Sequence, residues 1–292
     1  MLVVHGIGTR DKDHYLAEVA GLNEALGEQV RLIPVYWGDM GAPTQPLDSI
    51  LPYLAWSVRE DRASRYGSAE VRSAVASRDL TQVMDTVASG WRRWSGETRR
   101  RVLAAVYSLV RSQYQWASGE YTGDLIVYQR HQATVHSRVW REIRSHAAGY
   151  GEPERPIDVI SHSLGGAMVF DLAVAGDPAL HVRSLLTCAS QISYFHIIGC
   201  SPHRLDPTST GRPVTLPATI GAWTNFFVPF DPWAFLAAPV FTLSDGRVPE
   251  DVEVYAGDRG DRVLAHAASY YWTHPVFLAR ARERLGASGT TG

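Results

Sequence analysis

Short apolar runs alternate with longer segments of helical periodicity over most of the chain. The runs that predict strands are residues 2–4, 30–36, 157–160, 181–188, 220–228 and 252–256. The segments that predict helices are residues 13–26, 124–146, 164–175 and 275–285. Because strands and helices alternate, the pattern predicts an α/β fold with a mostly parallel sheet of about six strands. Pro34 predicts that the second strand lies at an edge or ends in a bulge.

The pattern changes between residues 41 and 120, where no apolar run predicts a strand. Four helical segments follow one another there, at residues 47–62, 69–77, 80–94 and 97–116. We therefore predict an α/β core formed by residues 1–40 and 121–292, and a helical insertion at residues 41–120. Arginines cluster around the start of the last segment, where they form either a solvated face or a surface for anionic lipid or another acidic partner.

The composition is that of an ordinary globular protein and argues against several classes of function. Of 292 residues, 45% are hydrophobic and 20% are charged, which excludes wholesale disorder. The formal net charge of −2 gives no basic footprint for nucleic acid over the whole chain. We see neither a signal-peptide pattern nor an apolar run of membrane-spanning length, so we expect a cytoplasmic protein. Cys188 and Cys200 form no zinc-binding pattern and favour two buried free thiols over a disulfide.

A serine between a predicted strand and a predicted helix gives the strongest chemical signal. The segment that follows the apolar run 157–160 reads Ser161-His162-Ser163-Leu164-Gly165-Gly166. In a nucleophile elbow the serine lies on a tight strand-to-helix turn, and the residues two before and two after it must be small. Ser161 and Gly165 meet this requirement around Ser163, although Ser161 replaces the usual glycine. The alternative is a glycine-rich helix start with an idle serine.

With this elbow the chain resembles the α/β-hydrolase superfamily, and within it the lipase and esterase group. The segment His5-Gly6-Ile7-Gly8 after the first predicted strand is similar to that group's oxyanion-hole loop. The resemblance covers roughly residues 1–40 and 121–285, and it implies an α/β-hydrolase fold with a helical cap or lid. Most such folds have two strands before the His-Gly strand, so the sheet is expected to be trimmed at its amino-terminal side.

The resemblance implies a full catalytic apparatus around Ser163. The backbone N–H groups of Ile7 and Leu164 would form the oxyanion hole, although His5-Gly6 can also be read as a simple turn. In this fold the acid and then the base follow the serine along the chain. Asp231 comes directly after the run 220–228, between two prolines, and is the predicted acid; Asp206 and Asp245 are alternatives.

Two of the eleven histidines, His266 and His274, follow Asp231 and are candidates for the base. His266 begins a His-x-x-Ser-Tyr run similar to that of the family's catalytic histidine, so it is preferred. His274 precedes a predicted helix start and is the alternative. With these partners Ser163 would attack an acyl carbonyl, His266 would shuttle the proton, and Asp231 would fix the imidazole tautomer.

These residues together predict a serine hydrolase that cleaves a carboxylic ester through an acyl-enzyme and requires no metal or cofactor. A thioesterase or acyltransferase with the same triad is the first alternative, and a binding protein that keeps the fold without turnover is the second. Trp37, Phe230 and Trp233 predict an apolar acyl or aryl pocket, with ordinary core packing as the competing interpretation. The expected partner is a small-molecule or lipid acyl ester, and a membrane surface is compatible but not required.

Overall fold

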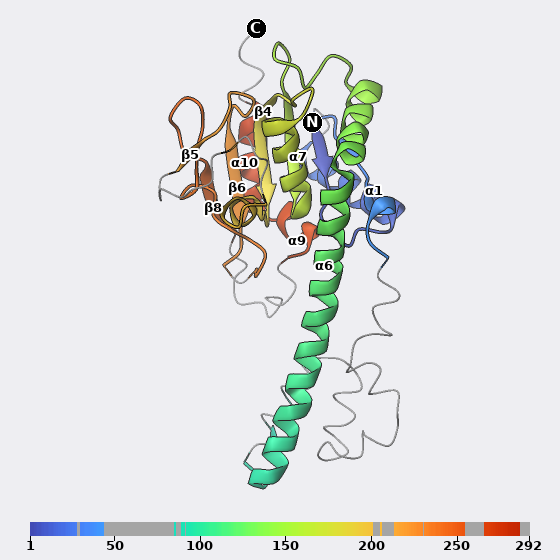
Figure 1. Ribbon diagram of the computed structural model, residues 1–292, viewed down its shortest axis with the longest axis vertical. Coiled ribbons are helices and arrows are strands. Elements are labelled where there is room, and N and C mark those ends of the chain that lie inside the picture. Colours follow the sequence, from blue (N-terminus) through green and yellow to red (C-terminus); the bar gives the residue numbers. More distant parts are fainter. Residues whose placement is uncertain are drawn as a thin grey trace. The chain divides into compact units, whose positions relative to one another are not determined.

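A computed structural model describes the chain at residues 1–27, 30–43, 85, 89–90, 92–200, 205, 213–229, 231–254 and 266–286 (Figure 1). For residues 98, 100–118, 285 and 286 this description covers the backbone alone. The chain divides into two compact units, Met1–Gly41 with Val127–Gly292, and Ala42–Ile126. The predicted helices at residues 47–62 and 69–77, and most of the one at 80–94, lie outside the described residues.

A six-stranded parallel sheet forms the centre of the first unit, with strand order β2-β1-β3-β4-β6-β8. Its strands are β1 (Leu2–Val4), β2 (Ile33–Val35), β3 (Ile157–His162), β4 (Val182–Cys188), β6 (Trp223–Phe227) and β8 (Glu250–Glu253). The α/β class, the parallel arrangement and the strand number are therefore confirmed. β2 lies at an edge, as Pro34 predicted, because an edge strand tolerates a residue without an N–H group. β5 (Val214–Thr215) and β7 (Phe241–Thr242) form a second, parallel pair that was not predicted.

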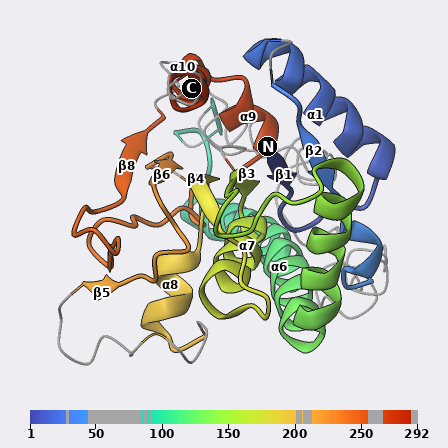
Figure 2. The same cartoon turned by 90° about the horizontal axis from the view of Figure 1, so that it is seen from above.

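Helices cover both faces of the sheet (Figure 2). One face carries α1 (Lys12–Leu26), α9 (Ala268–Trp272) and α10 (Pro275–Gly286). The other carries α7 (Leu164–Ala175), α8 (Ile192–Ile197) and the carboxyl-terminal part of α6 (Gly96–His146). A short 3-10 turn, η1 (Gly38–Met40), follows β2. The short helices α8 and α9 were not predicted, because five or six residues show too little periodicity.

The prediction that separate helices occupy residues 97–116 and 124–146 was wrong about the break between them. The chain stays helical through this stretch, and within α6 only His131 departs from helical dihedral angles (φ −123°, ψ 24°). Gly123 lies between the two predicted segments, and its missing side chain allows close packing. A Cβ there would lie 2.8 Å from Cβ of Ala42, in the same unit. The adjacent Asp124 is buried and accepts a hydrogen bond from the Ala42 N–H at 2.8 Å.

The core between the sheet and α1 follows from the apolar stripe of that helix. α1 begins at a cap in which the Asp11 carboxylate accepts hydrogen bonds from the N–H groups of Asp13 and His14. Its buried face packs against α10 and the central strands. The members of this cluster include Tyr15, Val19, Leu22, Leu26, Ile160, Leu186, Phe277 and Ala281. Each large side chain buried here stabilises the fold by about 1.5–3 kcal/mol, so the cluster anchors the strands that end at the candidate site.

Two further sequence predictions concern cysteine pairing and membrane insertion. Cys188 and Cys200 are free, but only Cys188 is buried; Cys200 is exposed, contrary to the expectation of two buried thiols. Within the described residues, no helix has both the length and the apolar character that crossing a bilayer requires.

A buried polar cluster joins α6 to α7 within the first unit. Asp171 Oδ2 accepts hydrogen bonds from the Tyr128 hydroxyl at 2.8 Å and from the Gln132 side-chain amide at 3.3 Å. The same hydroxyl lies 3.2 Å from His136 Nε2. Burial raises the pKa of Asp171 to about 7, against the opposing effect of the Tyr128 hydrogen bond. Burial also lowers the pKa of His136 to about 4, so both groups favour their neutral forms.

We expect Asp171→Asn to become more stable relative to the wild type as the pH rises. A carboxyl group whose pKa is higher in the folded state than in the unfolded state binds its proton more tightly when folded. Its stabilising contribution is therefore complete below the unfolded pKa and is lost as the pH rises through about 7. The free energy of unfolding that Asp171 loses over this range is at most ~4 kcal/mol.

Urea unfolding of both proteins between pH 5 and 8 measures this difference. The difference in unfolding free energy should widen up to about pH 7 and then level off. His136 titrates in both proteins, so its contribution cancels. A difference that does not change with pH contradicts the prediction.

Candidate active site

Ser163 lies on the turn between β3 and α7, in a backbone conformation that L-residues rarely adopt (φ 52°, ψ −128°). Such strain costs ~1–3 kcal/mol and persists only where surrounding structure imposes it. Here the Ser163 N–H donates to the carbonyl oxygen of Cys188 at 2.8 Å, and the Gly166 N–H donates to that of Ser163 at 2.9 Å. β3 lies between β1 and β4 in the sheet, so the turn is held from both sides.

Two glycines bring the end of β1 against this turn. A Cβ on Gly165 would lie 2.5 Å from the carbonyl oxygen of His5 and 2.7 Å from that of Val4. A Cβ on Gly6 would lie 2.6 Å from Cβ of Ser163. Both distances are shorter than real Cβ contacts, so any side chain at either position would push the His5–Gly6 loop away from the serine. The requirement for a small residue at position 165 thus comes from the neighbouring strand.

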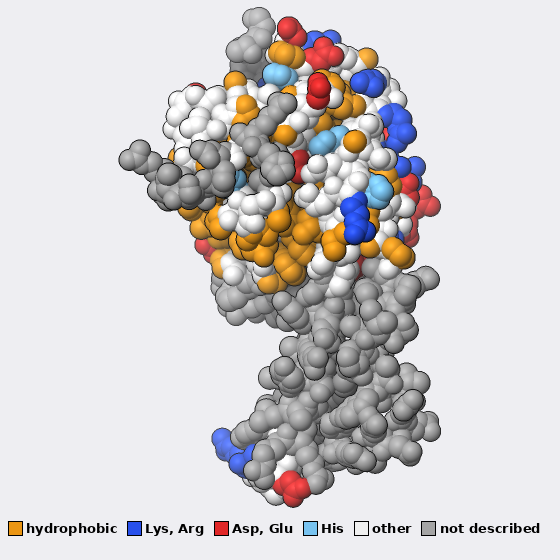
Figure 3. All heavy atoms as spheres, in the orientation of Figure 1, with side chains coloured by type: hydrophobic (Ala, Val, Ile, Leu, Met, Phe, Trp, Pro, Cys, Tyr) orange, Lys and Arg blue, Asp and Glu red, His pale blue; other side chains and the backbone are white. Residues whose placement is uncertain are grey.

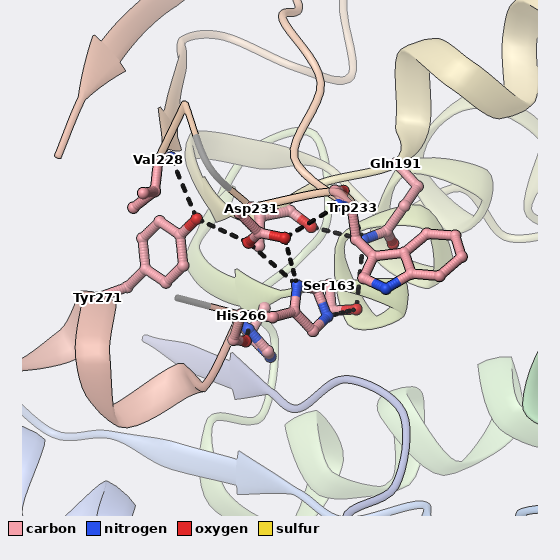
Figure 4. A network of polar contacts seen from close by, with 9 residues as sticks. Ser163, Gln191, Val228, Asp231, Trp233, His266 and Tyr271 are labelled. Atoms are coloured by element: carbon pink, nitrogen blue, oxygen red, sulfur yellow. Dashed lines mark hydrogen bonds and ion pairs between the residues drawn. The ribbon is translucent and has the colours of Figure 1, made fainter. Parts of the chain in front are cut away.

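The structure brings Ser163, His266 and Asp231 together in one hydrogen-bonded chain (Figure 4). His266 Nε2 lies 3.0 Å from Ser163 Oγ, and His266 Nδ1 lies 3.0 Å from each carboxylate oxygen of Asp231. The serine comes from the β3–α7 turn, the aspartate from the loop after β6, and the histidine from the turn before α9. An ionised carboxylate only accepts hydrogen bonds, so Nδ1 carries the ring hydrogen and Nε2 is left to accept the serine proton.

Two of the alternatives for the acid and the base, His274 and Asp245, make other contacts. The ring of His274 accepts a hydrogen bond from the Val276 N–H at the start of α10. Asp245 is exposed and forms an ion pair with Arg247. Asp206, like Phe230 of the predicted substrate pocket, lies outside the described residues.

Three donors surround the buried carboxylate of Asp231. Besides His266, they are the Trp233 backbone N–H and the Tyr271 hydroxyl, each at 2.9 Å. Burial alone would raise the pKa of Asp231, but hydrogen bonds and attraction from His266, together with the other two donors, hold it below its usual value. Asp231 is therefore ionised at neutral pH, as a group that stabilises an imidazolium must be.

Tyr271 is a member of the site whose role the sequence did not predict. Its hydroxyl donates to Asp231 and accepts a hydrogen bond from the Val228 N–H at 3.2 Å. Burial, followed by the charge and hydrogen bond of Asp231, raises the pKa of Tyr271 well above its usual range, so the hydroxyl stays a donor. The sequence feature that could have placed Tyr271 in the site is its position five residues after His266, but it was only one of several aromatic residues there.

Gln191 is a second such residue, and Figure 4 shows its amide directed toward Ser163. Gln191 Nε2 lies 2.6 Å from the Ala189 carbonyl oxygen, 2.9 Å from that of Trp233 and 3.3 Å from Ser163 Oγ. Two carbonyl oxygens can only accept, which identifies this atom as the nitrogen. Ala189, at the end of β4, also has a positive φ of 52°. The amide thus ties a strained strand end to the loop that carries Asp231.

The predicted oxyanion-hole residues lie at the two elements that meet at the serine. Leu164 is the first residue of α7, where the amides of the first helical turn have no partner within the helix. Ile7 lies in the turn after β1, directly after Gly6. Their roles as donors to an oxyanion remain predictions.

Trp37, which was predicted to bind substrate, is packed against His5. Its indole is buried, 1% exposed, and stacks on His5 with ring centroids 5.2 Å apart. Its backbone N–H donates to His5 Nε2 at 3.0 Å, and its Nε1 donates to the His5 carbonyl oxygen at 2.9 Å. Since Nε2 accepts, His5 Nδ1 carries the hydrogen and donates to the Gly6 carbonyl oxygen at 2.8 Å. Trp37 therefore supports the His5–Gly6 loop from behind.

Trp233, the third predicted pocket residue, is half-buried and lies beside Gln191 and Ser163 in Figure 4. The segment that follows it contributes to an apolar surface around α8, where Tyr194 stacks on Phe235 with ring centroids 5.0 Å apart. The large exposed side chains of this surface are Tyr194, Ile197, Ile198 and Leu236. Figure 3 shows hydrophobic side chains gathered on this face of the core.

Compared with protein-family models, with curated proteins and with solved structures, the chain matches none of them. No group of three or more His, Cys, Asp or Glu side chains within the described ranges is arranged to hold a metal ion. The chemistry of the site is therefore inferred from the hydrogen-bonded chain of Ser163, His266 and Asp231.

Proposed function

We propose that the protein is a serine hydrolase that cleaves a carboxylic ester through an acyl-enzyme. The observation that carries this proposal is the chain of contacts from Ser163 Oγ through His266 to Asp231, 3.0 Å at each step. A hydroxyl becomes an effective nucleophile when an adjacent base accepts its proton and a third group orients that base. The described geometry supplies all three groups, in the order expected of an α/β-hydrolase.

The reaction consists of two acyl transfers. Ser163 Oγ attacks the carbonyl carbon of the ester while its proton passes to His266 Nε2, and the ionised Asp231 stabilises the resulting imidazolium. The Ile7 and Leu164 N–H groups stabilise the negative oxygen of the tetrahedral intermediate. Collapse expels the alcohol, which takes the proton from His266. Water then attacks the acyl-enzyme by the same route, releasing the acid and restoring Ser163.

The sheet supports the further assignment to the α/β-hydrolase superfamily that the sequence resemblance implies. The nucleophile follows β3, in the interior of the parallel sheet, the acid follows β6, and the base follows β8. In open α/β sheets ligands bind at the carboxyl ends of the strands, which is where all three residues lie. In this assignment the unit Ala42–Ile126 is the cap, and the substrate is a small-molecule or lipid acyl ester.

Labelling with a fluorophosphonate probe tests the proposal directly. We expect the wild type to be labelled on Ser163, and Ser163→Ala to lose the label while remaining folded. Ser161→Ala is the matched control, because Ser161 is equally buried two residues away and its Oγ has no hydrogen-bond partner. Since Ser163 is 0% exposed, labelling is measured with and without brief detergent treatment. A folded wild type that resists the probe under both conditions contradicts the proposal.

A further inference from the structure

His162, the residue before the nucleophile, is bound to the loop that carries the base. Its Nε2 lies 2.6 Å from the backbone carbonyl oxygen of His266. Because a carbonyl oxygen only accepts, Nε2 must carry the ring hydrogen and donate it. The two imidazole rings also pack together, with centroids 5.0 Å apart. The contact joins residues 104 positions apart in the chain, so no local pattern could reveal it.

The hydrogen bonds from His162 and to Asp231 hold two different parts of His266. Asp231 holds the ring of His266 at Nδ1, whereas His162 holds its main chain at the carbonyl group. With both parts fixed, the ring keeps Nε2 facing Ser163 Oγ at 3.0 Å. Proton transfer needs this distance, and a displacement of about 1 Å is enough to slow a reaction ~100-fold.

His162 is itself rigidly placed. It is the last residue of β3 and is 6% exposed, and the strained turn at Ser163 follows at once. A Cβ on Gly6 would lie 2.9 Å from His162 Nδ1, so the predicted oxyanion loop packs against this ring. One imidazole thus contacts the loop of the base and the loop at the end of β1, and it adjoins the nucleophile in the chain.

The surroundings also keep His162 uncharged. Burial lowers the pKa of His162 to about 3, and repulsion from His266 and His5 adds to this, while Asp231 and the hydrogen bond to the His266 carbonyl oppose it. Tyr271, a further titratable group packed against His162, is a neutral donor. The positive charge that arises during catalysis therefore resides on His266 alone. A second charge 5.0 Å away would oppose its formation.

We propose that His162 is a positioning residue, which holds the catalytic base in register with the nucleophile through its hydrogen bond to the His266 carbonyl. This inference rests on the proposed hydrolase function. In this proposal the nucleophile elbow provides both the nucleophile, Ser163, and the residue that positions the base, His162.

Two substitutions at His162 separate the donor from the ring. His162→Phe keeps an aromatic ring and removes the donor, and we expect kcat for a p-nitrophenyl ester to fall about 100-fold with KM changed less than about threefold. His162→Gln places an amide nitrogen near the position of Nε2, and we expect it to recover at least about tenfold of this loss. His136→Phe is the matched control, because His136 is a half-buried histidine, also of lowered pKa, that contacts Tyr128. It should retain wild-type kcat.

Urea unfolding of each variant confirms that the proteins compared are folded, and the rate of fluorophosphonate labelling gives a second measure of serine reactivity. If His162→Phe is folded and keeps kcat within about threefold of the wild type, or if folded His162→Gln is as slow as His162→Phe, the inference is overturned while the hydrolase function stands. Absence of labelling in the wild type overturns the proposed function, and with it this inference.

Discussion

We expect His266→Ala to lower kcat for ester hydrolysis by about 10⁴-fold or more, since comparable triad residues have effects of this size. Without the imidazole no group accepts the serine proton during attack, and none returns it to the leaving alcohol. Nε2 of His266 is 3.0 Å from Ser163 Oγ, a distance at which the transfer is direct. Steady-state kinetics with a p-nitrophenyl ester and the rate of fluorophosphonate labelling measure the loss.

His274→Ala is the control for this substitution. His274 is the other histidine that follows Asp231 in the chain, and its ring accepts a hydrogen bond from Val276 at the start of α10. We expect its removal to leave kcat within about twofold, because a substitution away from the reacting groups removes no transition-state contact. If kcat fell strongly in His274→Ala and only slightly in His266→Ala, His274 would be the base, which would contradict the geometry described above.

The elements that the sequence predicted well are those whose burial is visible locally. β1 is wholly apolar, and β3 and β4 are buried almost throughout, because helices cover both faces of the sheet. The elbow was recognisable because a strained turn needs small neighbours at fixed spacing. The choice of His266 over His274 was likewise made from a short run of residues, and the structure places His266 beside Ser163.

The contacts that complete the site depend on segments far apart in the chain. Gln191 contacts Trp233 across 42 residues, and His162 contacts His266 across 104. A glutamine after a strand has no local feature that distinguishes it from a surface residue. Trp37 shows the converse, because an aromatic residue at a strand end suits a ligand pocket and a packed core equally well. Its burial against His5 is decided by how β1 and β2 pair.

Positive backbone dihedral angles mark the two strand ends at the centre of the site. Among the described residues other than glycine, Ser163 after β3 and Ala189 after β4 have φ of 52°. Strain of this kind persists only where several contacts impose it. The backbone bond from Ser163 to Cys188 and the amide of Gln191 supply such contacts. The cost of this strain is offset by the contacts that hold Ser163 on the turn above the sheet.

The second large effect is expected for Asp231→Asn, which should lower kcat by about 10⁴-fold with little change in fold. An amide in this position still accepts from Trp233 or Tyr271 through its oxygen, but it presents N–H groups to the ring of His266. Nδ1 then accepts, so the hydrogen moves to Nε2, the atom that must take the serine proton. The imidazole is retained in the wrong tautomer, and its positive form loses the carboxylate that stabilises it.

Tyr271→Phe tests how much of the effect of Asp231 comes from its charge and how much from the hydrogen bond that helps to hold it in place. This variant removes one of the three donors to Asp231 and leaves the carboxylate and its bond to His266 in place. Because that donor lowers the pKa of Asp231, its loss raises the pKa, and activity at low pH should be lost at a higher pH than in the wild type. Near neutral pH the carboxylate stays ionised, so kcat there should fall by only about tenfold or less. If Asp231→Asn fell no further than Tyr271→Phe at neutral pH, the tautomer argument would be wrong and Asp231 would serve only to place the ring.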